Sequence, residues 1–198
     1  MSEKQQYQSK SQLKAQYHLK KTIVMVGMMG AGKTAVGRAL AQRLGVPFLD
    51  SDAEIEAAAS RTVPEIFERD GEPFFRTKET QVIARLLDTE RGVLSTGGGA
   101  FLAQENRDII SERGVSVWLN ADLDLLWQRV RHKDTRPLLR TPDPRATLAE
   151  IYAARVPLYA LADVTVKSLP DLSIDEMVNR VIATMITERP DILEKLDA

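Results

Sequence analysis

Residues 27–34 have the sequence of a phosphate-binding loop. They read GMMGAGKT and fit the pattern G-x-x-x-x-G-K-[ST] in full. Glycines in such a loop let backbone N–H groups approach phosphate oxygens, and the following helix presents the positive end of its dipole. Lys33 would reach the terminal phosphates, and the hydroxyl of Thr34 would bind Mg²⁺. The segment therefore predicts a site for the magnesium complex of a nucleotide.

The same segment also fits a second pattern, the dinucleotide fingerprint G-x-G-x-x-G/A, at residues 30–35. Asp52 lies about 20 residues further on, where a ribose-binding acid is expected. A dinucleotide loop does not need a lysine and a hydroxyl side by side, whereas a magnesium–nucleotide site needs both. Lys33 and Thr34 therefore favour the nucleotide.

Two acids, Asp50 and Asp52, follow the next strand-like segment. Ligands of an open α/β sheet bind beyond the carboxyl ends of its strands, so both acids should face the phosphate loop. There an acid can hold Mg²⁺ through water or accept a proton from a substrate hydroxyl. The alternative is that Ser51 or Asp52 only caps the helix that follows. The segment alone favours neither interpretation.

Arg76 lies one turn into a predicted helix, beside Phe74 and Phe75. A guanidinium group matches a carboxylate or a phosphate with two parallel hydrogen bonds. A single arginine on a helix is more often solvated surface. The two phenylalanines indicate partial burial, which favours a binding role.

Three successive glycines, Gly97, Gly98 and Gly99, end the strand-like segment that begins at Val93. Such a run is costly in conformational entropy, so it indicates a place where the backbone must approach a ligand closely. The alternative is a tight turn without a ligand. Its position after a strand in a phosphate-binding protein favours the ligand.

Residues 131–144 are dense in charge and proline and fit neither a helix nor a strand. A mobile lid with arginines such as Arg136 could close over transferring phosphates, exclude water and neutralise charge. A solvated charged loop is the alternative. Arg155 lies further on, inside a helical pattern, while His18 and His132 have no neighbours that suggest catalysis or metal binding.

The elements that must position these residues follow from the apolar periodicity. Strand-like segments alternate with helical patterns, which implies right-handed crossovers and a parallel sheet covered on both faces. The strands are expected at 22–27, 46–49, 92–95, 115–119 and 163–167. The helices are expected at 33–44, 52–59, 63–70, 73–89, 104–113, 122–131, 145–160 and 173–187.

Composition excludes several classes of protein. The 198 residues suffice for one domain, and their net charge of −1 argues against a general nucleic-acid binder or a membrane-surface protein. Without cysteine the chain has no disulfide, thiolate metal site or cysteine nucleophile. No uncharged apolar run approaches the roughly 18 residues of a membrane span. The polar segment 1–21 is expected to be a flexible extension and 188–198 a tail, flanking one domain at 22–187.

Together the motifs resemble those of the shikimate kinase family along residues 22–187. GMMGAGKT, LDSD, GExxFR, TGGG, RPLL and RxPLY occur in that family's order and at about its spacing. The resemblance implies an α/β fold of the P-loop, nucleoside-monophosphate-kinase type. Such a fold has a five-stranded parallel sheet flanked by helices on both faces, a substrate-binding helical region and a lid. It further implies phosphorylation of the 3-hydroxyl of shikimate by MgATP, in the pathway to chorismate and aromatic amino acids.

The resemblance also implies roles for single residues. The phosphates of ATP would be held by Gly30, Ala31, Gly32, Lys33, Thr34 and Ala35. Mg²⁺ would be bound by Thr34 and, through water, by Asp50. Shikimate would be bound by Asp52, which orients or deprotonates its hydroxyl, and by Arg76, Gly97, Gly98, Gly99 and Arg155. Arg136 would close onto the phosphates from the lid, and either Arg129 or Arg131 would stack on adenine.

Two alternatives come from other functional classes. A sugar-acid kinase such as gluconate kinase shares the phosphate loop but would not need the acid pair, GExxFR and RPLL together. A catalytically silent relative would be expected to lose Lys33, Asp52 or Arg136, and all three are present. We therefore expect a cytoplasmic, monomeric enzyme that binds shikimate and ATP and neither nucleic acid nor a membrane.

Overall fold

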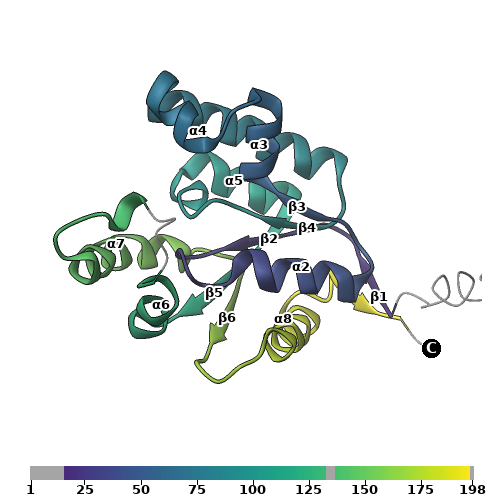
Figure 1. Cartoon of the computed structure of the whole chain (residues 1–198). Coiled ribbons are helices and arrows are strands. Elements are labelled where there is room, and N and C mark those ends of the chain that lie inside the picture. Colours follow the sequence, from purple (N-terminus) through teal and green to yellow (C-terminus); the bar gives the residue numbers. More distant parts are fainter. Residues whose placement is uncertain (1–15, 133–136, 197–198) are drawn as a thin grey trace, which may run out of the picture.

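The computed structural model describes residues 16–132 and 137–196 and is built around a five-stranded parallel sheet (Figure 1). The strand order is β3-β4-β2-β5-β6. The strands are β2 (Thr22–Val26), β3 (Phe48–Asp50), β4 (Val93–Ser95), β5 (Gly114–Ala121) and β6 (Val164–Ser168). The predicted α/β class and parallel sheet are thereby confirmed.

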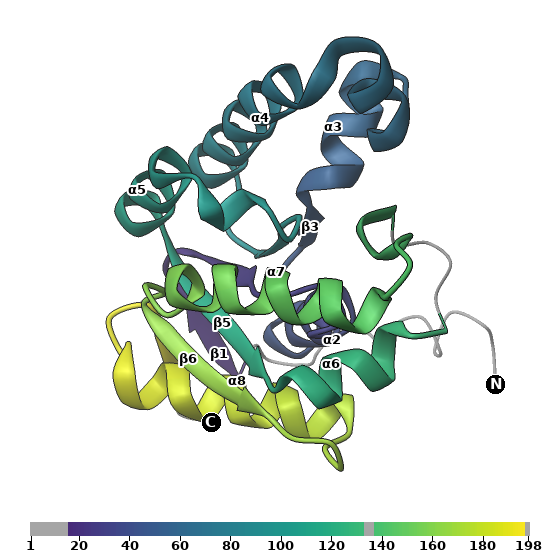
Figure 2. The same ribbon diagram turned by 90° about the vertical axis from the view of Figure 1, so that its left-hand side faces the viewer.

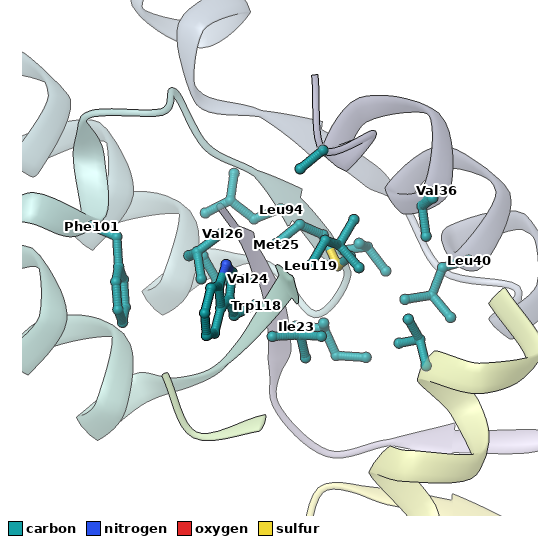
Figure 3. Packing of buried hydrophobic residues seen from close by; sticks show 14 of the residues in the cluster. Ile23, Val24, Met25, Val26, Val36, Leu40, Leu94, Phe101, Trp118 and Leu119 are labelled. Carbon is teal, nitrogen blue, oxygen red and sulfur yellow. The ribbon is translucent and has the colours of Figure 1, made fainter. Parts of the chain in front are cut away.

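The central strand β2 is buried at all five positions. Its run of β-branched and apolar residues suits a strand covered on both faces. Figure 3 shows Val36 and Leu40 on one side of this strand and Trp118 and Phe101 on the other. The core therefore extends on both sides of the sheet. The phosphate loop follows β2, the central and fully buried strand.

Helices cover both faces of the sheet (Figure 1). On one face α2 (Lys33–Leu44) packs against α8 (Ile174–Glu188). On the other, α5 (Gln104–Arg113) packs against β5 and α4. Two further helices, α6 (Leu123–Val130) and α7 (Pro144–Tyr159), contact each other, and the short helices η1 (Ala100–Leu102) and η2 (Pro137–Leu139) precede α5 and α7.

Two helices form a lobe that projects from the sheet, α3 (Ser51–Ala59) and α4 (Val63–Thr89) (Figure 2). A capping box at Thr62 and Glu65 starts α4. Gly71 interrupts its helical backbone with φ 82° and ψ 168°, a conformation that favours glycine. The predicted helices 63–70 and 73–89 are thus the two halves of α4, joined at a kink.

The segments expected to be a flexible extension and a tail each contribute a strand. β1 (Tyr17–Leu19) pairs antiparallel with β7 (Leu193–Lys195), with Leu19 opposite Leu193. Leu193 is fully buried, so these strands belong to the core. The domain therefore extends beyond the predicted boundaries at residues 22 and 187, because β1 and β7, far apart in sequence, form backbone hydrogen bonds with each other. Within the described ranges, no helix is long and apolar enough to cross a membrane.

Candidate active site

The phosphate loop follows β2 and ends at α2, as predicted. Gly30 has φ 81°, and a Cβ atom there would lie 2.6 Å from Cγ1 of Val130, so a larger residue would both strain the backbone and displace α6. Lys33 Nζ donates to the carbonyl oxygens of Gly27 (2.8 Å) and Met28 (3.0 Å). The ammonium group is thereby held over the phosphate loop, where it is expected to bind the terminal phosphates.

A cleft of about 500 Å³ opens in front of this loop. Residues of the loop, of the strand ends after β3 and β4, and of α6 and α8 line it together. Among the predicted site residues, its lining includes Gly30, Ala31, Gly32, Lys33, Thr34, Ala35, Asp50, Asp52, Gly97, Gly98 and Arg129.

Asp50, and neither Ser51 nor Asp52, caps α3. Its Oδ1 accepts from the backbone N–H groups of Asp52 (3.1 Å) and Ala53 (3.2 Å). Asp50 is the last residue of β3 and has an extended backbone, with φ −131° and ψ 117°, as N-cap residues do. The hypothesis that Ser51 or Asp52 is the cap is therefore wrong, and the carboxylate of Asp52 is not used in capping.

Asp52 lies in the first turn of α3 with its carboxylate turned into the protein. Within the described residues its Oδ1 is buried and accepts no hydrogen bond. Burial raises the pKa of Asp52, and the charge of Asp50 raises it further, whereas Lys33 and Arg76 act to lower it. A carboxyl group with a raised pKa beside a phosphate loop has the properties of a catalytic base.

Arg76 is held in place by two glutamates of its own helix. Its Nη1 donates to Glu79 Oε2 (2.8 Å), and its Nε and Nη2 donate to Glu72 Oε1 (3.2 and 3.1 Å). The side chain of Glu79 is only 1% exposed, and burial raises its pKa although Arg76 acts to lower it. In the described part of the chain Glu79 Oε1 has no hydrogen-bond partner. Glu79 therefore both orients Arg76 and keeps one acceptor oxygen free.

The three successive glycines bring these side chains together. A Cβ atom at Gly97 would lie 3.0 Å from Asp52 Oδ1 and 3.3 Å from Glu79 Oε1. One at Gly99 would lie 2.5 Å from Arg76 Nη2. The absence of side chains here lets two carboxylates and a guanidinium group approach the backbone. Side chains of the protein therefore approach the backbone at this run, and the binding of a ligand there stays a prediction.

Gly98 faces the remaining arginine. Its missing Cβ would lie 3.6 Å from Arg155 Nη1, an ordinary contact distance. Tyr159, one turn further along α7, is fully buried, and its hydroxyl donates to the carbonyl oxygen of Gly98 at 2.5 Å. Burial raises the pKa of the Tyr159 hydroxyl, and the nearby charge of Arg155 acts to lower it. α7 therefore fixes the glycine run and places Arg155 beside it.

The two candidates for adenine stacking differ in position. Arg129 lines the cleft, and its Nη1 donates to the carbonyl oxygens of Gly30 and Ala31 (both 3.4 Å). Arg131 is exposed in the turn after α6 and does not line the cleft. The geometry favours Arg129. The predicted lid arginine, Arg136, lies outside the described residues.

The atoms that could coordinate a magnesium ion in this cleft are oxygens. Thr34 Oγ1 lies 3.4 Å from Ser95 Oγ, and both residues line the cleft together with Asp50. Across the described ranges, no group of three or more acidic or histidine side chains could enclose a metal. This set fits Mg²⁺, which keeps several waters and takes only one or two protein oxygens beside the phosphates.

Comparison with known proteins bears on what this cleft does. Residues 29–186 match the family model described as shikimate kinase. A shikimate kinase of Ruegeria pomeroyi is 72% identical over 176 residues, which cover 89% of this chain and 90% of the relative. Another from Cereibacter sphaeroides is 66% identical, covering 89% of this chain and 87% of the relative. The chain belongs to the shikimate kinase family.

Solved structures agree with this membership. The shikimate kinase of Acinetobacter baumannii, in complex with shikimate, superposes with a TM-score of 0.79 at 39% identity, covering 85% of this chain and 94% of that one. A gluconokinase from Sinorhizobium meliloti 1021 gives a TM-score of 0.60 at 19% identity, covering 88% and 96%. That second likeness shows the fold alone. The family resemblance expected from the motifs is thus confirmed.

Sequence reasoning missed two residues of this shikimate kinase site. Glu79 could have been found from its spacing, because it lies three positions after Arg76 and therefore on the same helical face. Tyr159 belonged to a recognised motif, RxPLY, but no sequence signal shows that its hydroxyl meets Gly98. That contact depends on how α7 packs.

Proposed function

We propose that this chain transfers the terminal phosphoryl group of ATP to the 3-hydroxyl of shikimate. The observation that carries the proposal is the glycine run 97–99, which gathers Asp52, Glu79, Arg76 and Arg155 beside the phosphate loop. Two guanidinium groups and two carboxylates suit a small polyol that carries one carboxylate. A neutral sugar would offer Arg155 no anionic partner, and would offer Arg76 none beyond Glu72 and Glu79 of its own helix.

The substrate-side residues divide by charge. Arg76 and Arg155 would bind the carboxylate of shikimate, since guanidinium groups match carboxylates with paired hydrogen bonds. The unpaired oxygens of Asp52 and Glu79 would accept hydrogen bonds from its hydroxyls. The backbone N–H of Gly98 adds a further donor. Each buried acceptor that lacks a partner in the protein alone would gain one from the substrate.

Asp52 would orient the attacking hydroxyl and accept its proton. The raised pKa of Asp52 makes its carboxylate a stronger base than an ordinary aspartate. The charge of Lys33 acts to lower that pKa and so favours the ionised carboxylate, the form that can accept a proton. Most of the remaining catalysis of phosphoryl transfer is positioning and charge neutralisation.

The nucleotide-side residues hold the phosphates. Backbone N–H groups from Gly30 to Ala35 and the side chain of Lys33 would bind them, and Arg129 would stack on adenine. Thr34 and, through water, Asp50 would hold Mg²⁺, which supplies positive charge between the phosphate oxygens. The lid at 131–144 would bring Arg136 over the phosphates. We also propose that the protein acts as a monomer in the cytoplasm.

The proposal is tested by supplying purified protein with MgATP and shikimate, gluconate or quinate in separate reactions. ADP formation should depend on shikimate and on Mg²⁺. In a Lys33→Ala variant, kcat should fall by about 10²–10³, because a charge that faces the transferring group in a water-poor site contributes several kcal/mol. Turnover of gluconate without turnover of shikimate would overturn the proposal.

A further inference from the structure

A second cavity lies inside the α3–α4 lobe, apart from the phosphate-loop cleft. It measures about 530 Å³, within the range of ordinary ligand pockets, and shares no lining residue with the cleft. α3 and both halves of α4 enclose it, the two helices labelled on the projecting lobe in Figure 2. We name it the lobe cavity.

The lobe cavity has an apolar interior. Ile55, Ile66 and Val82 line it and are 2%, 1% and 9% exposed. Phe74 also lines it and is 42% exposed, so its side chain is partly open to solvent. A polyol such as shikimate would find few hydrogen-bond partners on these apolar side chains, whereas a flat apolar body could pack against the phenylalanine ring.

The charged residues of the lobe cavity are mostly cationic. Arg61, Arg69 and Lys78 line it, against a single acid, Asp70. Asp70 lies 3.6 Å from Arg69, so that pair is partly neutralised. Among residues 16–132 and 137–196, neither Arg61 nor Lys78 forms an ion pair. Arg61 donates to the carbonyl oxygen of Ala59 and Lys78 to Gln81.

We propose that the lobe cavity binds a flat, apolar molecule that carries one carboxylate. The apolar part would displace water from Ile55, Ile66 and Val82, and the carboxylate would pair with Lys78 and Arg61. Lys78 Nζ already lies 5.5 Å from the centre of the Phe74 ring. A ring stacked on Phe74 would therefore hold an attached carboxylate close to that ammonium group.

The position of the cavity brings an occupant next to the helices of the active site. Ile55 lies one turn after Asp52 on α3, and Val82 lies one turn after Glu79 on α4. The occupant would thus contact the two helices that carry Asp52 and Glu79. It would not contact the phosphate loop, whose residues line only the other cavity.

Calorimetry with two matched probes tests the proposal. The full chain is titrated with 2-naphthoate, and separately with the uncharged 2-naphthylmethanol, in saturating MgADP and shikimate to block the cleft. The naphthoate should bind saturably and about tenfold more tightly than the alcohol, since one well-placed charge contributes roughly that factor. Equal affinity of the two probes, or no saturable binding of naphthoate, would overturn it.

Paired variants locate the site. Ala58 lines the cavity and Ala57 does not, although both are exposed on α3. Ala58→Phe should abolish naphthoate binding, and Ala57→Phe should not. Lys78→Gln should weaken it about tenfold, whereas Lys195→Gln on β7 should leave it unchanged. Circular dichroism checks that each variant folds. If folded Ala58→Phe and Ala57→Phe bind naphthoate equally, the site is elsewhere and the proposal is refuted.

Discussion

Asp52 and Glu79 bring two carboxylates to the same glycine, Gly97, and neither has all its oxygens satisfied within the described chain. Buried acceptors without partners are costly in a folded protein. Their retention here is explained if the substrate supplies the missing donors. The site thus gives up some stability for binding, as functional sites often do.

The role of Asp52 is tested by Asp52→Asn. Because Asp50 is the cap, this change should not disturb the start of α3. Removal of a general base should lower kcat by about 10²–10⁴. Glu54→Gln, at a half-buried position of the same helix that pairs with Arg85 and does not line the cleft, should have little effect on kcat. Full activity of Asp52→Asn in steady-state assays would mean that another group handles the hydroxyl.

The raised pKa of Asp52 also predicts how stability depends on pH. A carboxyl group whose pKa is higher in the folded state favours folding when protonated and disfavours it when ionised. At neutral pH the permanently neutral Asp52→Asn should therefore melt no lower than the parent. Any advantage should shrink as the pH falls through the folded pKa of Asp52 towards the ordinary value of 3.8. A melting-temperature deficit of Asp52→Asn that is largest at neutral pH would contradict this.

Gly99 offers a test of how the glycine run acts. Its backbone is helical (φ −89°, ψ −17°), so alanine brings no backbone strain, only a clash with Arg76. Gly99→Ala should weaken shikimate binding by about tenfold or more, as expected when a charged hydrogen bond is lost. In an Arg76→Ala background the same change should add almost nothing. Independent, additive effects would show that Gly99 does not act through Arg76.

At the scale of elements, the periodicity predicted every strand of the main sheet and every long helix close to its observed bounds. In each of those elements apolar residues recur at regular spacing, so the element and its buried face can be predicted from its own sequence. The small β1–β7 sheet was missed because each strand has only three residues and gains its hydrogen bonds from a partner at the other end of the chain. Motifs indicated the candidate site residues, whereas Glu79 was overlooked although it lies one turn after Arg76, and the contact of Tyr159 with Gly98 emerged only from packing.

The β1–β7 sheet makes a prediction about stability. Leu193 is fully buried, so Leu193→Ala should lower the free energy of unfolding by about 2–5 kcal/mol. Leu196→Ala removes the same atoms at a position that is 42% exposed and should cost less than about 0.5 kcal/mol. Urea unfolding of both variants measures the difference. Equal stabilities would place the C-terminal strand outside the cooperative unit.

In the molecule as a whole, the residues expected to bind the nucleotide and those expected to bind the acceptor lie on different parts of the fold. The phosphate loop and Arg129 belong to the rigid sheet and its adjoining helices, whereas Asp52, Arg76 and Glu79 belong to the α3–α4 lobe (Figure 2). The glycine run after β4 lies between them and contacts the lobe side chains directly. The nucleotide is therefore expected to bind in the phosphate-loop cleft, and the acceptor where that cleft borders the α3–α4 lobe.

Calorimetric titration of Arg76→Ala with shikimate and with MgADP tests this division most directly. Shikimate binding should weaken by roughly 1.5–3 kcal/mol, the contribution of a charged hydrogen bond. MgADP binding should stay within about twofold of the parent, since Arg76 lies on the lobe and does not line the phosphate-loop cleft. An Arg76→Ala protein that loses MgADP binding but keeps shikimate binding would show that Arg76 binds the nucleotide and not the acceptor.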